Sequence, residues 1–322
     1  MKIKKILRTV AIVLLSVVLA VLLVLQVGVT VRYWHFFSNS KIAFLVPGLT
    51  DNFVPQGFEY LPEGDGYLIS GYMSDGTASR VYIRNAKGDT TYGTLLNKDG
   101  TPYTGHAGGI CVNGAYAYLP GDTGVDVFML RDILTGEARC LGTIQMGFRV
   151  DFCSFSNGYL LVGNFEYAGH YETPEYQHLT TPAGDHNTGL ITIYKADDKS
   201  LFSIDPNAVA ALSIREKIQG VCITDDGRIV LSTSWGLSDS KLYIYDLKTE
   251  NPGMIAALSG PLPLYYLDSA SLVKTVTAPP MAEEMVYKDG RILVLNESSC
   301  NKYFYGRLIR GSWVYAYNAD AE

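Results

Sequence analysis

Amide, imidazole and carboxylate side chains stand directly before five short apolar runs of this chain. They are Gln56, His106, Asp151, Gln219, Glu283 and Glu284. Carboxylates and imidazole move protons and bind metal ions in active sites, whereas amides mainly orient ligands. The candidate catalytic residues are therefore His106, Asp151 and Glu284, and the candidate ligand-binding residues are Gln56, His106, Gln219 and Glu283.

Two carboxylates near the C-terminus are predicted to converge. A hairpin that turns at the D-G pair 289–290 pairs position 284 with position 295, which brings Glu297 diagonally beside Glu284 on one face. Two such carboxylates can bind calcium or divide into an acid and a base. The alternative is that they accept hydrogen bonds from loop backbone. The candidate metal ligands are Glu284, Asn296, Asp151 and Glu297, and a divalent cation such as calcium is the cofactor that they would hold.

Two long connections carry further candidate contacts. One is EYAGHYETPEYQHLTTPAGDHN from Glu166, and the other is NESSCNKYFYGRLIRG from Asn296. Long connections without regular structure usually have a functional role. The loop residues added to the predicted ligand-binding surface are Trp235, Tyr303 and Arg307.

A repeated unit of β-strands must position these residues. Its first hairpin recurs five times at spacings of 43 to 68 residues, as QGFEYLPEGDGYLISGY from Gln56, GGICVNGAYAYLP from Gly108, DFCSFSNGYLLVGNF from Asp151, QGVCITDDGRIVLSTSW from Gln219 and EEMVYKDGRILVLNES from Glu283. A third strand follows in each unit. A fourth follows in four of them, as TTYGTLL from Thr90, ARCLGTI from Ala138, AVAALSI from Ala208 and MIAALSG from Met254. Repeated four-stranded antiparallel units are typical of a β-propeller.

The last unit lacks a fourth strand, and KIAFLVPG in 41–48 is a strand without a unit. Adding this strand to the last unit closes the ring and removes a free sheet edge. The sequence therefore predicts an all-β domain over 41–322, with five blades favoured. A six-bladed ring is the alternative if 163–190 or 260–281 forms a further blade, and a pair of β-sandwiches is the remaining one.

The charge and cysteine content of the chain exclude some classes of function. The part of the chain after Arg32 carries 21 basic and 32 acidic residues, so it is acidic overall. A phosphate-binding surface needs the opposite charge, and nucleic acid is therefore not expected as a partner. The five cysteines show no C-x-x-C spacing, and three of them fall at similar places in predicted innermost strands. These three, Cys111, Cys153 and Cys222, are interpreted as small core residues.

The N-terminus has the features of a membrane anchor. From Thr9 to Val31 no residue is charged, and a helix of that length spans about 34 Å at 1.5 Å per residue. Basic residues dominate the tail 1–8, which places the N-terminus in the cytoplasm, and a short linker over 32–40 then leads to a domain outside the cell membrane. A cleaved signal peptide is the alternative, but its apolar run would be shorter.

The polar residue before each innermost strand and the turns at Asp225 and Lys288 resemble a broad group of extracytoplasmic propellers. This group includes the gluconolactonase and strictosidine-synthase-like proteins, and the resemblance covers most of 41–318 at the level of repeat architecture. Such proteins commonly hold a divalent cation in the channel with Glu, Asn and Asp side chains. The resemblance points here to Glu284, Asn296 and Asp151, although those families have six blades.

Two functions from different classes follow. The first is a membrane-anchored binding or scaffolding module for a cell-envelope glycan or protein, because propellers often bind without catalysis. The second is a metal-assisted hydrolase of the lactonase or glycan-cleaving type. Convergence of three or more of the predicted ligands at the channel mouth would favour the enzyme. Separate hydrogen bonds to backbone would favour the binding module.

Overall fold

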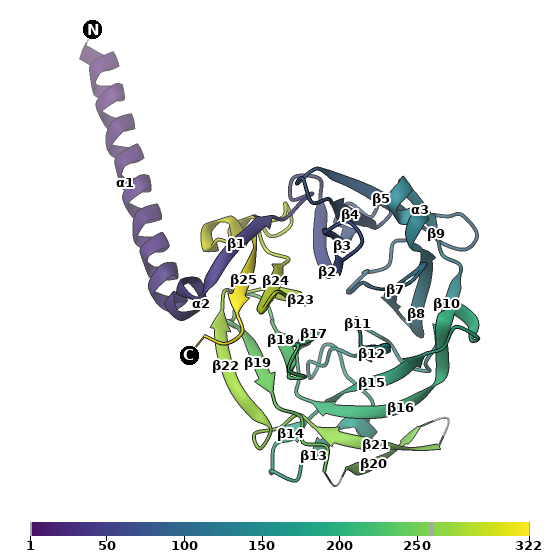
Figure 1. The fold of residues 1–322 in the computed structure, drawn as a ribbon. Helices are drawn as coiled ribbons and strands as arrows, with labels where there is room; N and C mark the ends of the chain where they lie inside the picture. Colours follow the sequence, from purple (N-terminus) through teal and green to yellow (C-terminus); the bar gives the residue numbers. More distant parts are fainter. Residues whose placement is uncertain (1, 251, 258–259, 322) are drawn as a thin grey trace.

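Five β-sheets surround a central channel in the computed structural model, which describes residues 2–250, 252–257 and 260–321 (Figure 1). The five-bladed propeller predicted from the repeats is confirmed. In these described residues neither 163–190 nor 260–281 forms a sixth blade. The second stretch instead contributes outer strands to two of the five blades.

Each blade starts with its innermost strand at the channel. Blade 1 contains β2 (Phe53–Leu61), β3 (Gly66–Met73), β4 (Arg80–Arg84) and β5 (Thr90–Leu96), with β9 (Glu137–Arg139) added in parallel to β5. Blade 2 contains β6 (Cys111–Asn113), β7 (Tyr116–Gly121), β8 (Gly124–Met129) and β10 (Gly142–Gln145). The helix α3 (Leu130–Thr135) connects β8 to β9.

Blade 3 is the widest. It contains β11 (Phe152–Ser156), β12 (Tyr159–Gly163), β15 (Gly189–Ala196), β16 (Ile204–Ile214), β21 (Gly260–Tyr266) and β20 (Gly253–Ala257). The long connection after β12 folds into the turn η1 (Glu175–Gln177) and the hairpin of β13 (Leu179–Thr180) and β14 (His186–Asn187), and η2 (Leu201–Ser203) precedes β16. Blade 4 contains β17 (Ile218–Ile223), β18 (Ile229–Thr233), β19 (Ser240–Tyr245) and β22 (Leu272–Ala278).

The N-terminal strand closes the ring, as the sequence predicted. Blade 5 contains β23 (Ala282–Lys288), β24 (Arg291–Asn296), η3 (Phe304–Ile309) in the following loop, β25 (Trp313–Asn318) and, at its outer edge, β1 (Ser40–Leu45). Strand β1 runs antiparallel to β25 (Figure 1). The hairpin between β23 and β24 turns at Asp289 and Gly290, which both have positive φ, as a two-residue D-G turn requires.

Two of the segments predicted to be the fourth strand of a blade occupy other positions in the structure. The first part of MIAALSG, Met254 to Ala257, lies in β20, which pairs with β21 at the edge of blade 3, so β22 is the fourth strand of blade 4. Residues 258–259 of that segment lie outside the described residues. ARCLGTI divides into β9, which extends blade 1, and β10, which completes blade 2. Both segments have the composition of an edge strand, and only the geometry of the long connections decides which edge each one reaches.

Beta-bulges mark the start of three innermost strands. The register slips by one residue around Gln56 in β2, around Gln219 in β17, and between Ala282 and Met285 in β23. A bulge redirects a side chain out of the regular alternation. The polar residues singled out from the sequence at these three starts are therefore bulge residues.

The N-terminal helix docks onto the ring. Helix α1 (Lys2–Arg32) is long and apolar enough to cross a membrane, with a mean hydropathy of 3.1 over its best 18 residues. Val29 in its last turns and Tyr33 just after it are buried, and the short helix α2 (Trp34–Ser38) buries Phe36 against blades 4 and 5. Residues 32–40 are thus packed against the domain. Figure 1 shows α1 projecting from the rim of the ring.

We expect Phe44→Ala to lower the free energy of unfolding by about 3–5 kcal/mol, because Phe44 anchors β1 in the core between blades 5 and 1. Ile42→Ala in the same strand is the matched control, because Ile42 is 59% exposed. Denaturation of the full chain in detergent measures both variants. Equal losses would contradict a closing role for Phe44.

Candidate functional site

The propeller has two distinct ends. The innermost strands begin on one face, called here the loop face, which also carries the connections between second and third strands. They end on the opposite face, called here the hairpin face, where each strand turns back. The sequence placed the candidate site at the loop face. The pocket in the structure lies toward the hairpin face.

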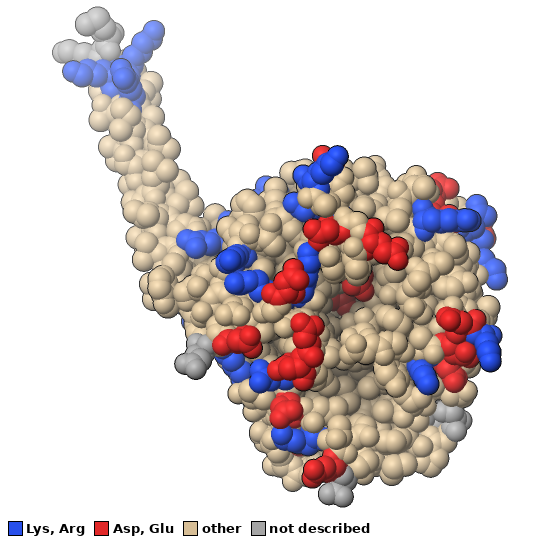
Figure 2. Space-filling view, in the orientation of Figure 1, with Lys and Arg blue, Asp and Glu red and all other residues tan. Residues whose placement is uncertain are grey.

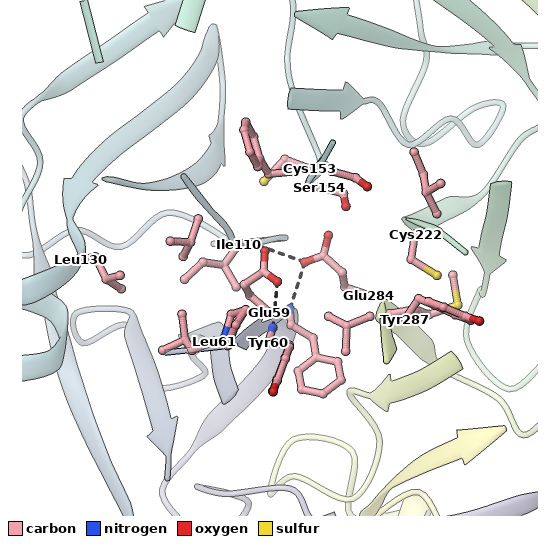
Figure 3. A pocket seen from close by; sticks show the side chains of 18 of the residues that line it. Glu59, Tyr60, Leu61, Ile110, Leu130, Cys153, Ser154, Cys222, Glu284 and Tyr287 are labelled. Carbon is pink, nitrogen blue, oxygen red and sulfur yellow. Dashed lines mark hydrogen bonds between the residues drawn. The ribbon is translucent and has the colours of Figure 1, made fainter. Parts of the chain in front are cut away.

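A cavity of about 450 Å³, called here the channel pocket, occupies the hairpin half of the channel. All five innermost strands contribute to its wall, and apolar side chains form most of that wall. Its polar members include Glu59 and Glu284, which both project into the pocket in Figure 3. A concave, largely apolar site with a few convergent polar groups is the usual form of a small-molecule site.

Glu284 lies at the inner end of the channel pocket. One carboxyl oxygen, Oε2, accepts hydrogen bonds from the N–H of Phe58 in blade 1 at 2.9 Å and of Ile110 in blade 2 at 3.0 Å. The other oxygen, Oε1, is buried and has no hydrogen-bond partner among the described residues. Burial, with the nearby Cys153 and Glu59, raises the pKa of Glu284 well above its usual value.

Glu59 is the second carboxyl group of the channel pocket. It comes from β2, where its Oε1 accepts the N–H of Tyr60 at 2.8 Å. Burial raises the pKa of Glu59 to about 8, so this carboxyl group is largely protonated at neutral pH. The channel pocket therefore presents one carboxyl group that can donate a proton and a second, Glu284, with an unpaired oxygen.

Acidic side chains gather around the central hollow that Figure 2 shows. The hairpin turns supply several of them: Glu63, Asp65, Asp225, Asp226 and Asp289. Asp65 is paired with Lys288, and Asp226 with Arg228 at 3.2 Å. A mouth with this charge attracts cations and hydrogen-bond donors and repels anions.

Glu283 and Glu297 lie together at the loop-face end of the channel. Gln56 donates to Glu297 at 2.8 Å, and Gln219 donates to Ser234, whose hydroxyl lies 3.5 Å from Glu283. Burial raises the pKa of Glu297 to about 7, and burial together with the charge of Glu297 raises the pKa of Glu283 well above its usual value. The predicted ligand-binding residues at this end form a hydrogen-bonded cluster.

The predicted pairing of position 284 with position 295 is wrong. In the structure Ala282 pairs with Asn296 and Met285 with Val294, so Glu283 and Glu284 both bulge opposite position 295. The bulge sends Glu283 toward Glu297 and Glu284 toward the neighbouring blades. The bulge inserts one extra residue into β23. The regular alternation of side chains along a strand, on which the prediction was based, does not include such an insertion.

The predicted metal ligands have separate partners. Asp151 forms an ion pair with Arg149 at 2.8 Å and accepts the N–H of Phe165 at 2.7 Å. The Asn296 amide donates to the carbonyl of Trp313 at 3.3 Å. Within the described part of the chain, no group of three His, Cys, Asp or Glu side chains is arranged to hold a metal ion. These carboxylates act mainly as acceptors for backbone and side-chain donors.

His106 stacks on Tyr72 with ring centroids 4.7 Å apart. Burial, and then the positive charges of Lys302 and Arg149, lower the pKa of His106 to about 4, so the imidazole is neutral at physiological pH. A neutral imidazole can accept a proton. The channel pocket, however, does not include His106 among its lining residues.

The predicted loop contacts lie on the loop face and bind to the protein itself. Trp235 packs against Tyr167 at 4.5 Å between ring centroids. The backbone N–H of Tyr303 donates to the carbonyl of Cys300, and Arg307 donates to the carbonyl of Ser299 at 3.0 Å. All five cysteines are buried and free, and the burial of Cys111, Cys153 and Cys222 agrees with their interpretation as small core residues.

Glu59 and the hairpin-face pocket were missed from the sequence. A signal existed, because Glu59 is a charged residue within the otherwise apolar run GFEYL of an innermost strand. Innermost strands border the channel, so a carboxylate within one is a candidate for its wall. The catalytic candidates chosen from the sequence stand at or before the starts of these strands, whereas Glu59 lies near the end of one.

No protein-family model and no curated protein matches this chain. Solved structures with a similar fold include the hydrazine synthase of Kuenenia stuttgartiensis, at 14% identity and a TM-score of 0.39, covering 77% of this chain and 56% of that one. This chain thus spans little more than half the length of the hydrazine synthase chain.

Two further similar structures are sugar dehydrogenases by description. A protein of Thermus thermophilus described as a putative glucose dehydrogenase has 14% identity and a TM-score of 0.46, over 86% of this chain and 99% of that one. The PQQ-bound aldose sugar dehydrogenase of Streptomyces coelicolor has 15% identity and a TM-score of 0.42, over 80% of this chain and 78% of that one. Likenesses at this level concern the propeller architecture and not the site.

We expect Glu284→Ala to destabilise the ring by about 2–4 kcal/mol, because it leaves the N–H groups of Phe58 and Ile110 without an acceptor. Glu284→Gln keeps one amide oxygen at that place and should unfold close to the parent protein. Thermal denaturation of the full chain in nanodiscs distinguishes the two variants. An equal effect of Ala and Gln would show that the two hydrogen bonds carry no stability.

Stability should depend on pH through Glu59. Its pKa is about 8 in the folded protein and that of an ordinary Glu when unfolded, so the unfolded chain releases this proton first as pH rises. The folded state therefore loses stability between about pH 4.5 and pH 8. We expect Glu59→Gln to raise the thermal midpoint at pH 9 by about 2–4 °C and to have no such benefit at about pH 4. A pH-independent difference would contradict this.

Proposed function

We propose that this protein is a membrane-anchored binding module that takes the end of a small or extended ligand into the channel pocket. The observation that carries the proposal is the buried Oε1 of Glu284, which lacks a partner among the described residues and lies in the wall of a cavity of about 450 Å³. An unpaired buried acceptor is costly, and a ligand donor would satisfy it.

The chemistry of the channel pocket defines the ligand class. Glu284 offers an acceptor, Glu59 offers a second carboxyl group, and the acidic hairpin turns disfavour anions. Leu61, Leu130 and Tyr287 give the wall apolar and aromatic surface. This combination suits a ligand with hydroxyl or amino donors on an apolar face, such as the terminal sugar or amino sugar of a cell-envelope glycan.

The location of the ligand follows from the N-terminal anchor. Helix α1 crosses the cell membrane, with the basic residues Lys4, Lys5 and Arg8 at its cytoplasmic end and the propeller outside. The ligand is then a component of the envelope close to the membrane surface. This placement rests on the distribution of charge around the helix.

A second candidate function is hydrolysis by acid–base catalysis. It is favoured by the presence of two carboxyl groups in one cavity, of which Glu59 is protonated at neutral pH. Glycosidases use two carboxyl groups, one of which donates a proton. Here Glu284, whose pKa burial also raises, would be the second carboxyl group and would take the other role once it loses its proton. The binding function stands first because Glu284 already uses one oxygen to accept two backbone N–H groups.

Titration of the full chain in nanodiscs with a panel of methyl glycosides, amino sugars and lactones tests both functions. We expect at least one amino sugar or glycoside to bind, and Glu284→Gln to weaken it about 10- to 100-fold by replacing the acceptor with an amide. Glu297→Gln, at the other end of the channel, is the matched control and should bind normally.

Two outcomes would contradict the binding function. Affinity unchanged in both Glu284→Gln and Glu59→Gln would place the ligand outside the channel pocket. Turnover of 4-nitrophenyl glycosides that is lost in Glu59→Gln would instead establish the hydrolase.

A further inference from the structure

The loop that contains η3 exposes large apolar side chains beside the anchor helix. Phe304 is 64% exposed, and Leu308 one turn further is also exposed. Trp34, which follows α1 closely, is exposed as well. Large apolar side chains gathered at one place on a surface usually contact another apolar phase.

Specific contacts fix η3 against α1. The side-chain amide of Gln26 donates to the carbonyl of Leu308 at 2.7 Å. Arg310 donates to Gln26 at 3.2 Å and to Thr30 at 2.8 Å. The loop is therefore held at the height of Gln26 along the helix.

The covered face of α1 extends further toward its N-terminus. Leu22 and Leu25 are each 37% exposed, whereas Leu23 and Val24 between them are 66% and 72% exposed. The domain therefore shields one side of the helix several residues before its end, along the face that continues through Val29.

The length of a membrane core sets the depth of this contact. Counted from Thr9, the first residue after Arg8, a hydrocarbon core of about 30 Å requires about 20 helical residues and ends near Gly28. Gln26 then lies inside the boundary of the bilayer. Because Leu308 is hydrogen-bonded to Gln26, η3 must lie at the same depth.

We propose that the η3 loop, 297–312, is a membrane-contacting surface that inserts Phe304 and Leu308 into the interface of the bilayer beside α1. Aromatic side chains favour this interface, and the exposed Trp34 follows the end of α1. The domain is thus attached by a helix and a loop together. This inference rests on the proposed anchor and does not depend on the channel ligand.

Spin labels on single introduced cysteines in the full chain test this surface in phosphatidylglycerol–phosphatidylcholine nanodiscs. The native cysteines are buried, so Phe304→Cys labels selectively. Leu201→Cys is the matched control, because Leu201 is exposed in η2 on the hairpin side of blade 3. Val18→Cys in α1 reports insertion of the anchor. We expect the ratio of oxygen to nickel-chelate accessibility at 304 to exceed that at 201 by at least about threefold.

The outcomes separate the loop from the anchor. A lipid-exposed label at 18 with equal ratios at 304 and 201 would overturn the proposed surface and leave the anchor intact. A water-exposed label at 18 would overturn the anchor and the surface together. Leu308→Cys provides a second position in the loop, and its label should follow the one at 304.

Discussion

A single carboxylate joins three of the five blades at the centre of the ring. Glu284 of blade 5 accepts the backbone N–H groups of Phe58 in blade 1 and Ile110 in blade 2. Inner strands leave an edge unpaired at the channel, and such groups need partners when they are buried. The same residue thereby fixes the spacing of the inner strands and sets the inner end of the channel pocket. Its second oxygen is buried without a hydrogen-bond partner among the described residues.

Close packing around this carboxylate explains two glycines. A Cβ at Gly220 would lie 2.7 Å from the Cα of Glu284, and one at Gly57 would overlap the backbone of Gly109. Only glycine permits inner strands to approach so closely. The bulges at Gln56 and Gln219 stand directly before these glycines, so the Q-G pairs combine a redirected amide with a close backbone contact.

The blade count, the closing strand and the tight D-G turn could be predicted because they depend on local pattern and on the need to remove a free edge. The strand MIAALSG was assigned to the wrong blade, because an edge strand pairs according to the length and course of its connections. The position of Glu284 depended on one extra residue in β23, which no alternation of apolar and polar residues reveals. Glu59 could be recognised in the sequence as an acidic residue in an apolar strand. Which end of the channel holds the pocket, however, could be decided only from the three-dimensional structure.

The anchor and the pocket are connected through blade 5. Strand β1 closes this blade, β23 supplies Glu284, and η3 binds the end of α1 through Gln26 and Leu308. Figure 1 views the ring down its channel while α1 is seen from the side, so the channel does not run along the helix. With α1 across a membrane, the pocket mouth faces along the membrane surface. A ligand attached to that surface or lying parallel to it can then reach Glu284 without the domain turning.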